Sequence, residues 1–426
     1  MNRLTTTGTS GDSRRIVSNS VTLIASRILT KIATTLLIIY VARSLGDERF
    51  GVFSSLLAFM ALFSLIVEFG LTVPLIRKIA HGIHDPGEAL GRVLTLKIPL
   101  SLMGFGLLVG SSFFFDIPIS LALVFGISMV IEMLALSVTR SFEGFEKMKY
   151  VALITIVERT FFCALGFIVL FLGGSLFALA WVYVVTNLIS LALGVYLFTK
   201  RFSGFRLSLP RDRVVPLLRE AFPFFVATVF SVLYARADIF LLTTFSTTAE
   251  VGWYNAAVRI IDAQMFVPVA IVGSVFPVLS RYYVSEPRRF AEVYKSSFYV
   301  LLGLGIAVSL VTLFFADSII TYLYTAQFAK AIEPLKILSI MLSFYYVNFL
   351  VGNALIATGR ERFATATLAI GALLNIVLNS VLIPRYGTHG AAWAKVVTEV
   401  AAFCIQFYLL VRVIGVRGGR AVAWSK

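Results

Sequence analysis

Apolar residues fill about twelve long stretches of the chain, and short polar segments separate these stretches. A helix needs about 20 apolar residues to cross the hydrocarbon core of a bilayer. The stretches therefore predict about twelve transmembrane helices, of which the first, seventh and eighth are long enough to tilt or extend past the membrane. They lie at residues 17–42, 50–75, 90–113, 118–139, 150–172, 177–199, 214–243, 250–280, 296–316, 333–357, 364–384 and 391–411.

The joining segments carry Lys and Arg almost entirely on one side of the predicted membrane. One set of alternate segments, with both chain ends, holds 24 of these residues, and the other set holds four. Lys and Arg accumulate in cytoplasmic loops. The asymmetry predicts cytoplasmic N- and C-termini in a multi-pass protein of the cell membrane. Because no small-residue cleavage site follows the first apolar stretch, we expect no cleaved signal.

Composition supports a membrane protein and excludes several other classes. The chain is 59% hydrophobic and 14% charged, against about 25% charged residues in soluble domains. Its net charge of +15 is spread between the apolar stretches, which favours contact with lipid headgroups over nucleic acid. The two cysteines lie inside apolar stretches and no Cys/His cluster occurs, so neither a disulfide framework nor a metal site is expected.

The two halves of the chain resemble each other. Gly51, at the start of the second stretch, has a counterpart in Gly252 at an offset of 201 residues, and Gly144 aligns with Gly359 at an offset of 215. Six helices per half give both halves the same orientation, as in transporters with parallel repeats. The sequence thus predicts an all-α integral membrane protein of two six-helix bundles related by a pseudo-two-fold axis along the membrane normal.

The predicted topology divides the chain into five parts: a cytoplasmic tail at 1–16, an N-terminal bundle at 17–199, a cytoplasmic linker at 200–213, a C-terminal bundle at 214–411 and a cytoplasmic tail at 412–426.

Charged residues inside the predicted helices mark the candidate site, because a charge at the bilayer centre costs about 2.5–3.5 kcal/mol on insertion scales. Arg27 and Lys31 are four residues apart and share one helix face at mid-membrane. Two stacked cations need an anion between them or carboxylates on neighbouring helices. Bound phosphates would satisfy them.

The C-terminal half holds further intramembrane charges. Arg259 and Asp262 are three residues apart and can pair on one face, whereas Arg236 and Asp238 diverge and need other partners. The two aspartates could balance these cations or carry a coupling proton or sodium ion. Lys395 and Glu399, which are four residues apart, are expected to form an internal pair.

Several ordered segments carry a family resemblance. They read ARSLGDERFGVF at 42–53, EFGL at 68–71 followed by Arg77, RADIFLL at 236–242, EVGWYNAA at 250–257 with Arg259, and a final run from Asn375 and Asn379 through IPRYG at 383–387 to GAA at 390–392. In this order the chain resembles the polysaccharide-transporter, or Wzx-like, flippases of the multidrug/oligosaccharidyl-lipid/polysaccharide exporter superfamily. The resemblance runs from about residue 17 to 411.

The resemblance implies a V-shaped pair of bundles around a central cavity. It implies translocation of a polyprenyl-pyrophosphate-linked oligosaccharide from the cytoplasmic to the outer leaflet by alternating access, for cell-surface polysaccharide biosynthesis. Cavity cations of related flippases bind the pyrophosphate, and this role carries over to Arg27 and Arg259. For Lys31 and Arg236 a substrate-binding role rests on their chemistry alone. Membrane lipids and polysaccharide-assembly enzymes are the other expected partners.

Other functions fit the sequence less well. A membrane glycosyltransferase would need reactive groups in a sizeable outer loop, and the outer loops here are short. None of the lysines follows a glycine, so the chain has no Walker A loop for ATP. A multidrug or organic-cation antiporter of the same superfamily stays open, although its site should be acidic. We therefore expect no enzyme activity and no cofactor, with transport driven by protons, sodium ions or the membrane potential.

Overall fold

The computed structural model describes residues 10–82, 85–202, 204–208 and 210–417, and within them the side chains from residue 32 to 412 except residue 211. Throughout these ranges the regular elements are helices, since in lipid every backbone polar group has to be satisfied within its own segment. They are α1 (Ser10–Glu68), α2 (Thr72–Ala80), α3 (Pro86–Ser111), α4 (Ile119–Gly144), α5 (Met148–Phe171), α6 (Leu176–Arg201), α7 (Arg211–Phe245), α8 (Thr248–Gln264), α9 (Phe266–Ser285), α10 (Pro287–Phe314), α11 (Ala316–Leu323), the 3₁₀ helix η1 (Ala326–Ala331), α12 (Ile332–Ala357) and α13 (Glu361–Arg417).

Two of these helices are each broken into two membrane crossings by a glycine. Gly46 in α1 has φ 80° and Gly387 in α13 has φ 53°, a region that glycine enters without steric cost. The described chain holds ten apolar segments long enough to span a membrane, and the two breaks raise the number of crossings to twelve. The predicted all-α fold is therefore confirmed.

The predicted C-terminal end of the second transmembrane helix is wrong. The helix ends at Glu68, not at residue 75, because Phe69 and Gly70 both adopt positive φ, at 40° and 68°. The residues beyond this turn form the separate short helix α2.

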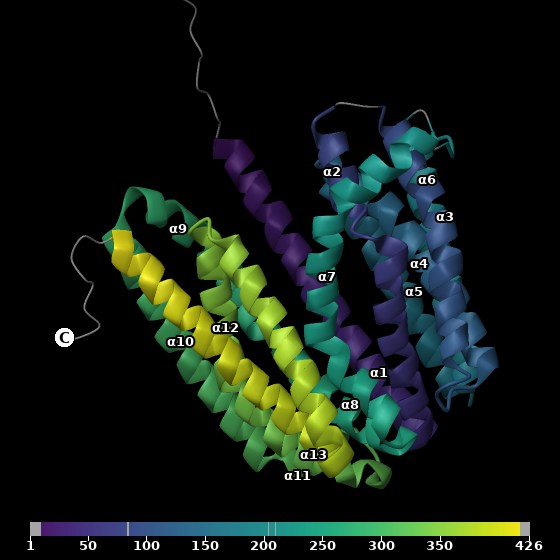
Figure 1. The fold of residues 1–426 in the computed structure, drawn as a ribbon, viewed down its shortest axis with the longest axis vertical. Coiled ribbons are helices and arrows are strands. Elements are labelled where there is room, and N and C mark those ends of the chain that lie inside the picture. The colour runs from purple at the N-terminus through teal and green to yellow at the C-terminus, as the bar shows by residue number, and fades with distance from the viewer. Residues whose placement is uncertain (1–9, 83–84, 203, 209, 418–426) are drawn as a thin grey trace, which may run out of the picture.

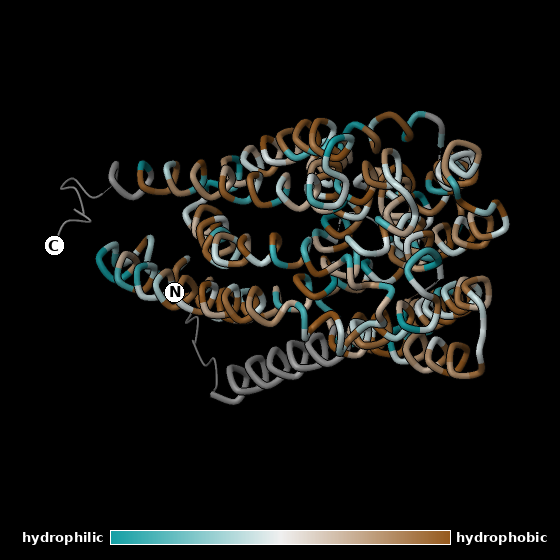
Figure 2. The backbone as a smooth tube through the Cα atoms, turned by 90° about the horizontal axis from the view of Figure 1, so that it is seen from below, coloured by the Kyte–Doolittle hydropathy of each residue, from teal (hydrophilic) through white to brown (hydrophobic). Residues whose placement is uncertain are grey.

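The crossings form two bundles (Figure 1). α1 to α6 make up the first and α8 to α13 the second, and they diverge toward the end that carries α2 and α9. At the opposite end the second half of α1 packs directly on α8. Apolar residues predominate along the helices of both bundles (Figure 2), as expected of helices that face lipid as well as one another.

The repeat seen in the sequence becomes a contact between its two copies. A Cβ atom on Gly51 would lie 1.7 Å from the carbonyl oxygen of Thr248, and one on Gly252 would lie 2.2 Å from that of Asp47. Thr248 is the residue 201 positions after Asp47, so the two contacts are symmetric. One turn further on, Asn255 Nδ2 donates a 2.5 Å hydrogen bond to Oγ of Ser54, its own counterpart. The pseudo-two-fold axis therefore passes through this glycine contact.

The second sequence match is displaced by two residues. At the end of α4, Lys147 N donates to the carbonyl of Phe142 and Glu146 has φ 56°; at the end of α12, Arg360 N donates to the carbonyl of Leu355 and Gly359 has φ 71°. Both are the same helix-ending hydrogen-bond pattern. The equivalent of Gly359 is thus Glu146, at an offset of 213, and not Gly144. The sequence match missed this because Glu146 adopts positive φ without being a glycine.

The first part of α7 packs against the first bundle. Leu217 and Ala221 belong to an apolar core built mainly from α2 to α6, and Lys78 Nζ lies 2.7 Å from a carboxylate oxygen of Glu220. The rings of Phe69 and Phe225 stack at 4.5 Å between centroids. The later part of α7 packs against α13 in the second bundle, so one helix joins both bundles.

We expect Gly51→Ala to separate the bundles at the α1–α8 contact, because its methyl group would overlap the Thr248 carbonyl. Cysteines replacing Ser54 and Asn255 can report this distance through the yield of a short thiol cross-link. The yield should fall several-fold when Gly51→Ala is added. Gly106→Ala is the matched control, since a Cβ there meets nothing within 4 Å; equal yields in both backgrounds would contradict the glycine contact.

Candidate functional site

A cavity of about 550 Å³ lies in the first bundle, and its described lining includes one residue of the second bundle. Its walls come from α1, α4, α5 and α6, and Arg259 of α8 enters from the other bundle. Arg259 is seven residues, or two helical turns, after Gly252 and so lies on the same face of α8. The close glycine contact therefore directs Arg259 toward the first bundle. The lining residues are Thr34, Ile38, Leu57, Met60, Ala61, Ser64, Glu132, Met133, Thr155, Arg159, Phe162, Tyr183 and Arg259.

Arg259 has no carboxylate within ion-pair distance among the described side chains, and its buried Nε makes no hydrogen bond there. Arg236 and Asp262 are close enough to interact electrostatically with Arg259. They pair with each other, with 3.9 Å between Arg236 Nη1 and Asp262 Oδ2. The pair expected between Arg259 and Asp262 is thus replaced by one between Arg236 and Asp262. A guanidinium left unpaired at a cavity wall is suited to bind an anion.

The cavity also holds charges that the sequence analysis did not assign to the site. Arg159 of α5 and Glu132 of α4 both line it, so two guanidinium groups share the space with one carboxylate. The neighbouring Glu158 lies 3.5 Å from Arg159 and accepts a hydrogen bond from Ser190. The sequence did place both charges inside predicted helices, Glu132 in 118–139 and Arg159 in 150–172. It gave no indication that either of them lies beside Arg259.

Arg27 and Lys31 were predicted to line the same cavity from the first helix. Their side chains lie outside the described part of the molecule, so their roles stay predictions. Arg236, whose guanidinium pairs with Asp262, is not among the residues that line the cavity.

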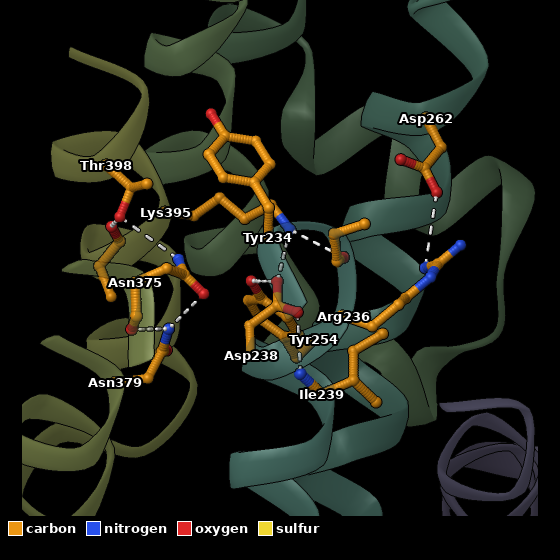
Figure 3. A network of polar contacts seen from close by, with 12 residues as sticks. Tyr234, Arg236, Asp238, Ile239, Tyr254, Asp262, Asn375, Asn379, Lys395 and Thr398 are labelled. Carbon is orange, nitrogen blue, oxygen red and sulfur yellow. Dashed lines mark hydrogen bonds and ion pairs between the residues drawn. The ribbon is translucent and has the colours of Figure 1, made fainter. Parts of the chain in front are cut away.

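A buried ion pair holds α7 against α13 in the second bundle (Figure 3). Lys395 Nζ lies 2.7 Å from Asp238 Oδ2 and 3.3 Å from the carbonyl oxygen of Ala235. Asp238 is fully buried and also accepts hydrogen bonds from the Tyr254 hydroxyl and the backbone of Ile239. Every oxygen of this carboxylate therefore has a donor. Asp238 thus balances Lys395 and not one of the two arginines with which the sequence analysis grouped it.

The predicted pair between Lys395 and Glu399 is wrong, because Lys395 reaches across to α7 instead. Glu399 lies one turn further along α13 and accepts hydrogen bonds from the Tyr234 hydroxyl at 2.7 Å and from Asn348 Nδ2 at 2.9 Å. It lines a second cavity of about 200 Å³ between α7, α12 and α13. Helical spacing correctly put both residues on one face but could not show which groups of other helices face them.

We expect Lys395→Met to destabilise the protein, because it leaves the fully buried Asp238 carboxylate without its cation. Removing one partner of a buried ion pair costs about 3–5 kcal/mol. We expect a loss of this size in the free energy of unfolding, measured in detergent micelles. The double variant Asp238→Asn/Lys395→Met should lose less than Lys395→Met alone. Lys78→Met is the control, since its partner Glu220 is 40% exposed and an exposed pair contributes about 0–1 kcal/mol. A loss in Lys395→Met no larger than in this control would contradict the buried pair.

Comparison with known proteins places the chain among transporters. The family profile described as polysaccharide biosynthesis protein matches residues 16–283, and a second profile, MatE, matches residues 223–381. The chain is 25% identical over 375 residues to the probable low-salt glycan biosynthesis flippase Agl15 of Haloferax volcanii, covering 84% of this chain and 75% of that one. It is also 25% identical over 365 residues to a putative O-antigen transporter of Shigella dysenteriae, covering 85% and 91%.

Solved structures share the fold at low sequence identity. An inward-facing multidrug resistance MATE family transporter of the MOP superfamily superposes with a TM-score of 0.74 at 16% identity, over 91% of this chain and 95% of that one. The lipid II flippase MurJ, in an inward-closed conformation, superposes with a TM-score of 0.70 at 14% identity, over 92% and 87%. The named relatives are transporters and flippases, not enzymes. The chain is a multi-pass membrane transporter with the fold of the MOP superfamily, and it belongs to the polysaccharide biosynthesis protein family.

Proposed function

We propose that the protein translocates a polyprenyl-pyrophosphate-linked oligosaccharide from the cytoplasmic to the outer leaflet of the cell membrane by alternating access. The observation that carries this proposal is the guanidinium of Arg259, which lies at the wall of the 550 Å³ cavity and has no carboxylate partner among the described side chains. Pyrophosphate is a compact anion with oxygens that guanidinium groups bind through paired hydrogen bonds. The polyprenyl tail would stay in lipid while the headgroup enters.

The charge of the cavity favours an anionic cargo over a cationic one. Among the described lining residues are two arginines, Arg159 and Arg259, and one carboxylate, Glu132; Glu158 lies beside Arg159 but does not line the cavity, and Arg259 has no such carboxylate within ion-pair distance. An organic cation, the cargo of the alternative antiporter function, would meet a net positive wall. The aromatic rings of Phe162 and Tyr183 in the same cavity could stack on a cation and are the feature that keeps this alternative worth testing. Arg27 and Lys31, if they face the cavity, would add to its positive charge.

The position of the bundles supports loading from the cytoplasm. They are held together at the α1–α8 end, where the connecting segments carry few Lys and Arg residues, and diverge at the end rich in them. By the distribution of positive charge the diverging end and both termini are cytoplasmic. Relatives named glycan flippase and O-antigen transporter support a lipid-linked glycan as cargo. Enzymes of polysaccharide assembly would then act before and after this step.

We expect Arg259→Gln to slow translocation by about ten- to a hundredfold, because a charge-assisted hydrogen bond contributes about 1.5–3 kcal/mol and each 1.4 kcal/mol is tenfold. The measurement is protection of a lipid-linked oligosaccharide from an external glycosidase in proteoliposomes. Arg288→Gln is the matched control, since that arginine is exposed at the start of α10.

Equal rates for Arg259→Gln and wild type would contradict the anion site. If wild type moves no lipid-linked glycan but releases a lipophilic organic cation from the same vesicles, the antiporter function replaces the proposed one. Adding Arg27→Gln and Lys31→Gln to the Arg259 variant should remove any translocation that remains.

A further inference from the structure

The wall of the 550 Å³ cavity carries a carboxylate that the described part of the chain leaves without a partner. Glu132 of α4 lines this cavity, and its charged neighbours are Glu158 and Arg159 of α5. Neither oxygen of Glu132 accepts a hydrogen bond from a described residue or lies within ion-pair distance of one, whereas Arg159 lies 3.5 Å from Glu158. A carboxylate away from bulk water requires donors, so Glu132 is suited to receive them from the cargo.

Hydroxyl groups of two neighbouring helices line the same cavity and are also available to a ligand. Thr155 of α5 and Tyr183 of α6 are both half-buried, and neither hydroxyl makes a hydrogen bond within the described ranges. Each hydroxyl can donate one hydrogen bond and accept others, whereas the ionised carboxylate of Glu132 only accepts. Three successive helices of the first bundle thus contribute one hydrogen-bonding wall, formed by Glu132, Thr155 and Tyr183.

Neighbouring aromatic rings fix the position of Tyr183 in this wall. Between ring centroids, Tyr183 lies 4.5 Å from Phe162, 5.5 Å from Phe125 and 6.2 Å from Phe53. A side chain that is already held in place loses little conformational freedom when a ligand binds. The hydroxyl of Tyr183 is therefore presented to the cavity in a preorganised position.

The hydrogen-bonding wall adjoins the arginines that are suited to bind an anion. Tyr183 is close enough to interact electrostatically with Arg259, Arg159 and Glu132. In the proposed cargo the pyrophosphate is bonded to the lipid on one side and to the first sugar on the other. A pyrophosphate held by Arg259 would therefore bring the first sugar, and not one further along the glycan, to this wall.

We propose that Glu132, Thr155 and Tyr183 bind the sugar bonded directly to the pyrophosphate, and that they select a sugar with hydroxyl or acetamido N–H donors and no carboxylate. This subsite rests on the proposed transport function. The hydroxyls of such a sugar donate charge-assisted hydrogen bonds to Glu132. A uronic acid at the same place would set a second negative charge against this carboxylate, which discriminates against it.

The size of the cavity limits how much of the glycan it holds. Its volume of 550 Å³ lies in the usual range of small-ligand sites, about 300–1,000 Å³. The cavity therefore takes the lipid-proximal end of the cargo, and the remaining sugars extend beyond it. Selection at the first sugar would leave the rest of the glycan free to vary.

The test is binding of three short-chain probes to the purified full-length protein in detergent. The probes are farnesyl pyrophosphate, farnesyl pyrophosphate joined to N-acetylglucosamine, and farnesyl pyrophosphate joined to galacturonic acid. We expect wild type to bind the N-acetylglucosamine probe about tenfold more tightly than farnesyl pyrophosphate, because the sugar adds charge-assisted hydrogen bonds. The galacturonic acid probe should show no such gain.

Variants separate sugar binding from anion binding. Glu132→Gln should reduce the gain from N-acetylglucosamine several-fold and should bind farnesyl pyrophosphate no more weakly than wild type. Tyr183→Phe, which removes only the hydroxyl, should lower the gain in the same way. Glu158→Gln is the matched control, since Glu158 lies beside Arg159 but is not among the described lining residues, and it should keep the gain.

The sugar subsite is wrong if wild type binds farnesyl pyrophosphate as tightly as the N-acetylglucosamine probe, if galacturonic acid gives an equal gain, or if Glu132→Gln keeps the full gain. Should Glu132→Gln fail to fold, an unchanged gain in Tyr183→Phe overturns the proposal. Failure of the anion site gives a different result, because Arg259→Gln would then bind farnesyl pyrophosphate as tightly as wild type. If wild type binds none of the three probes, both proposals are wrong.

Discussion

The backbone contact between Gly51 and Gly252 determines how the rest of the molecule is arranged. Two helices can approach this closely only where neither carries a side chain, since a Cβ on either glycine would fall 1.7–2.2 Å from a carbonyl oxygen of the other helix. The contact lies on the pseudo-two-fold axis and joins α1 to α8. It also places the following turns of α8 against the first bundle, and for this reason Arg259 reaches a cavity built by the other half of the chain.

The intramembrane charges divide into pairs and exceptions. Lys395 pairs with Asp238 and Arg236 with Asp262 within the second bundle, and each pairing offsets part of the cost of burying the two charges. Arg259 and Glu399 lack such a partner among the described side chains, and each of them lines a cavity. The two exceptions therefore face different neighbours, Arg259 a cavity of the first bundle and Glu399 a cavity between α7, α12 and α13.

α7 connects these features because it contacts both bundles. Its first part is buried with Leu71, Leu75 and Phe198 in the core of the first bundle, while Tyr234 and Asp238 further along contact residues of α13. A change in the packing of α7 against α13 would thus be transmitted to the first bundle through one continuous helix.

The sequence alone determined the number of crossings, their approximate limits, the charge asymmetry of the loops and the glycine pair of the repeat, because each depends on local composition or spacing. Tertiary structure decided the partners. Helical spacing showed that Lys395 and Glu399 share a face, but only the packed bundle brings Asp238 of α7 to that lysine. Likewise Arg259, Arg159 and Glu132 all lie within predicted transmembrane stretches, and only the contact between bundles placed them in one cavity. Periodicity specifies the face of a helix, whereas the neighbour of that face is set by contacts between residues far apart in the chain.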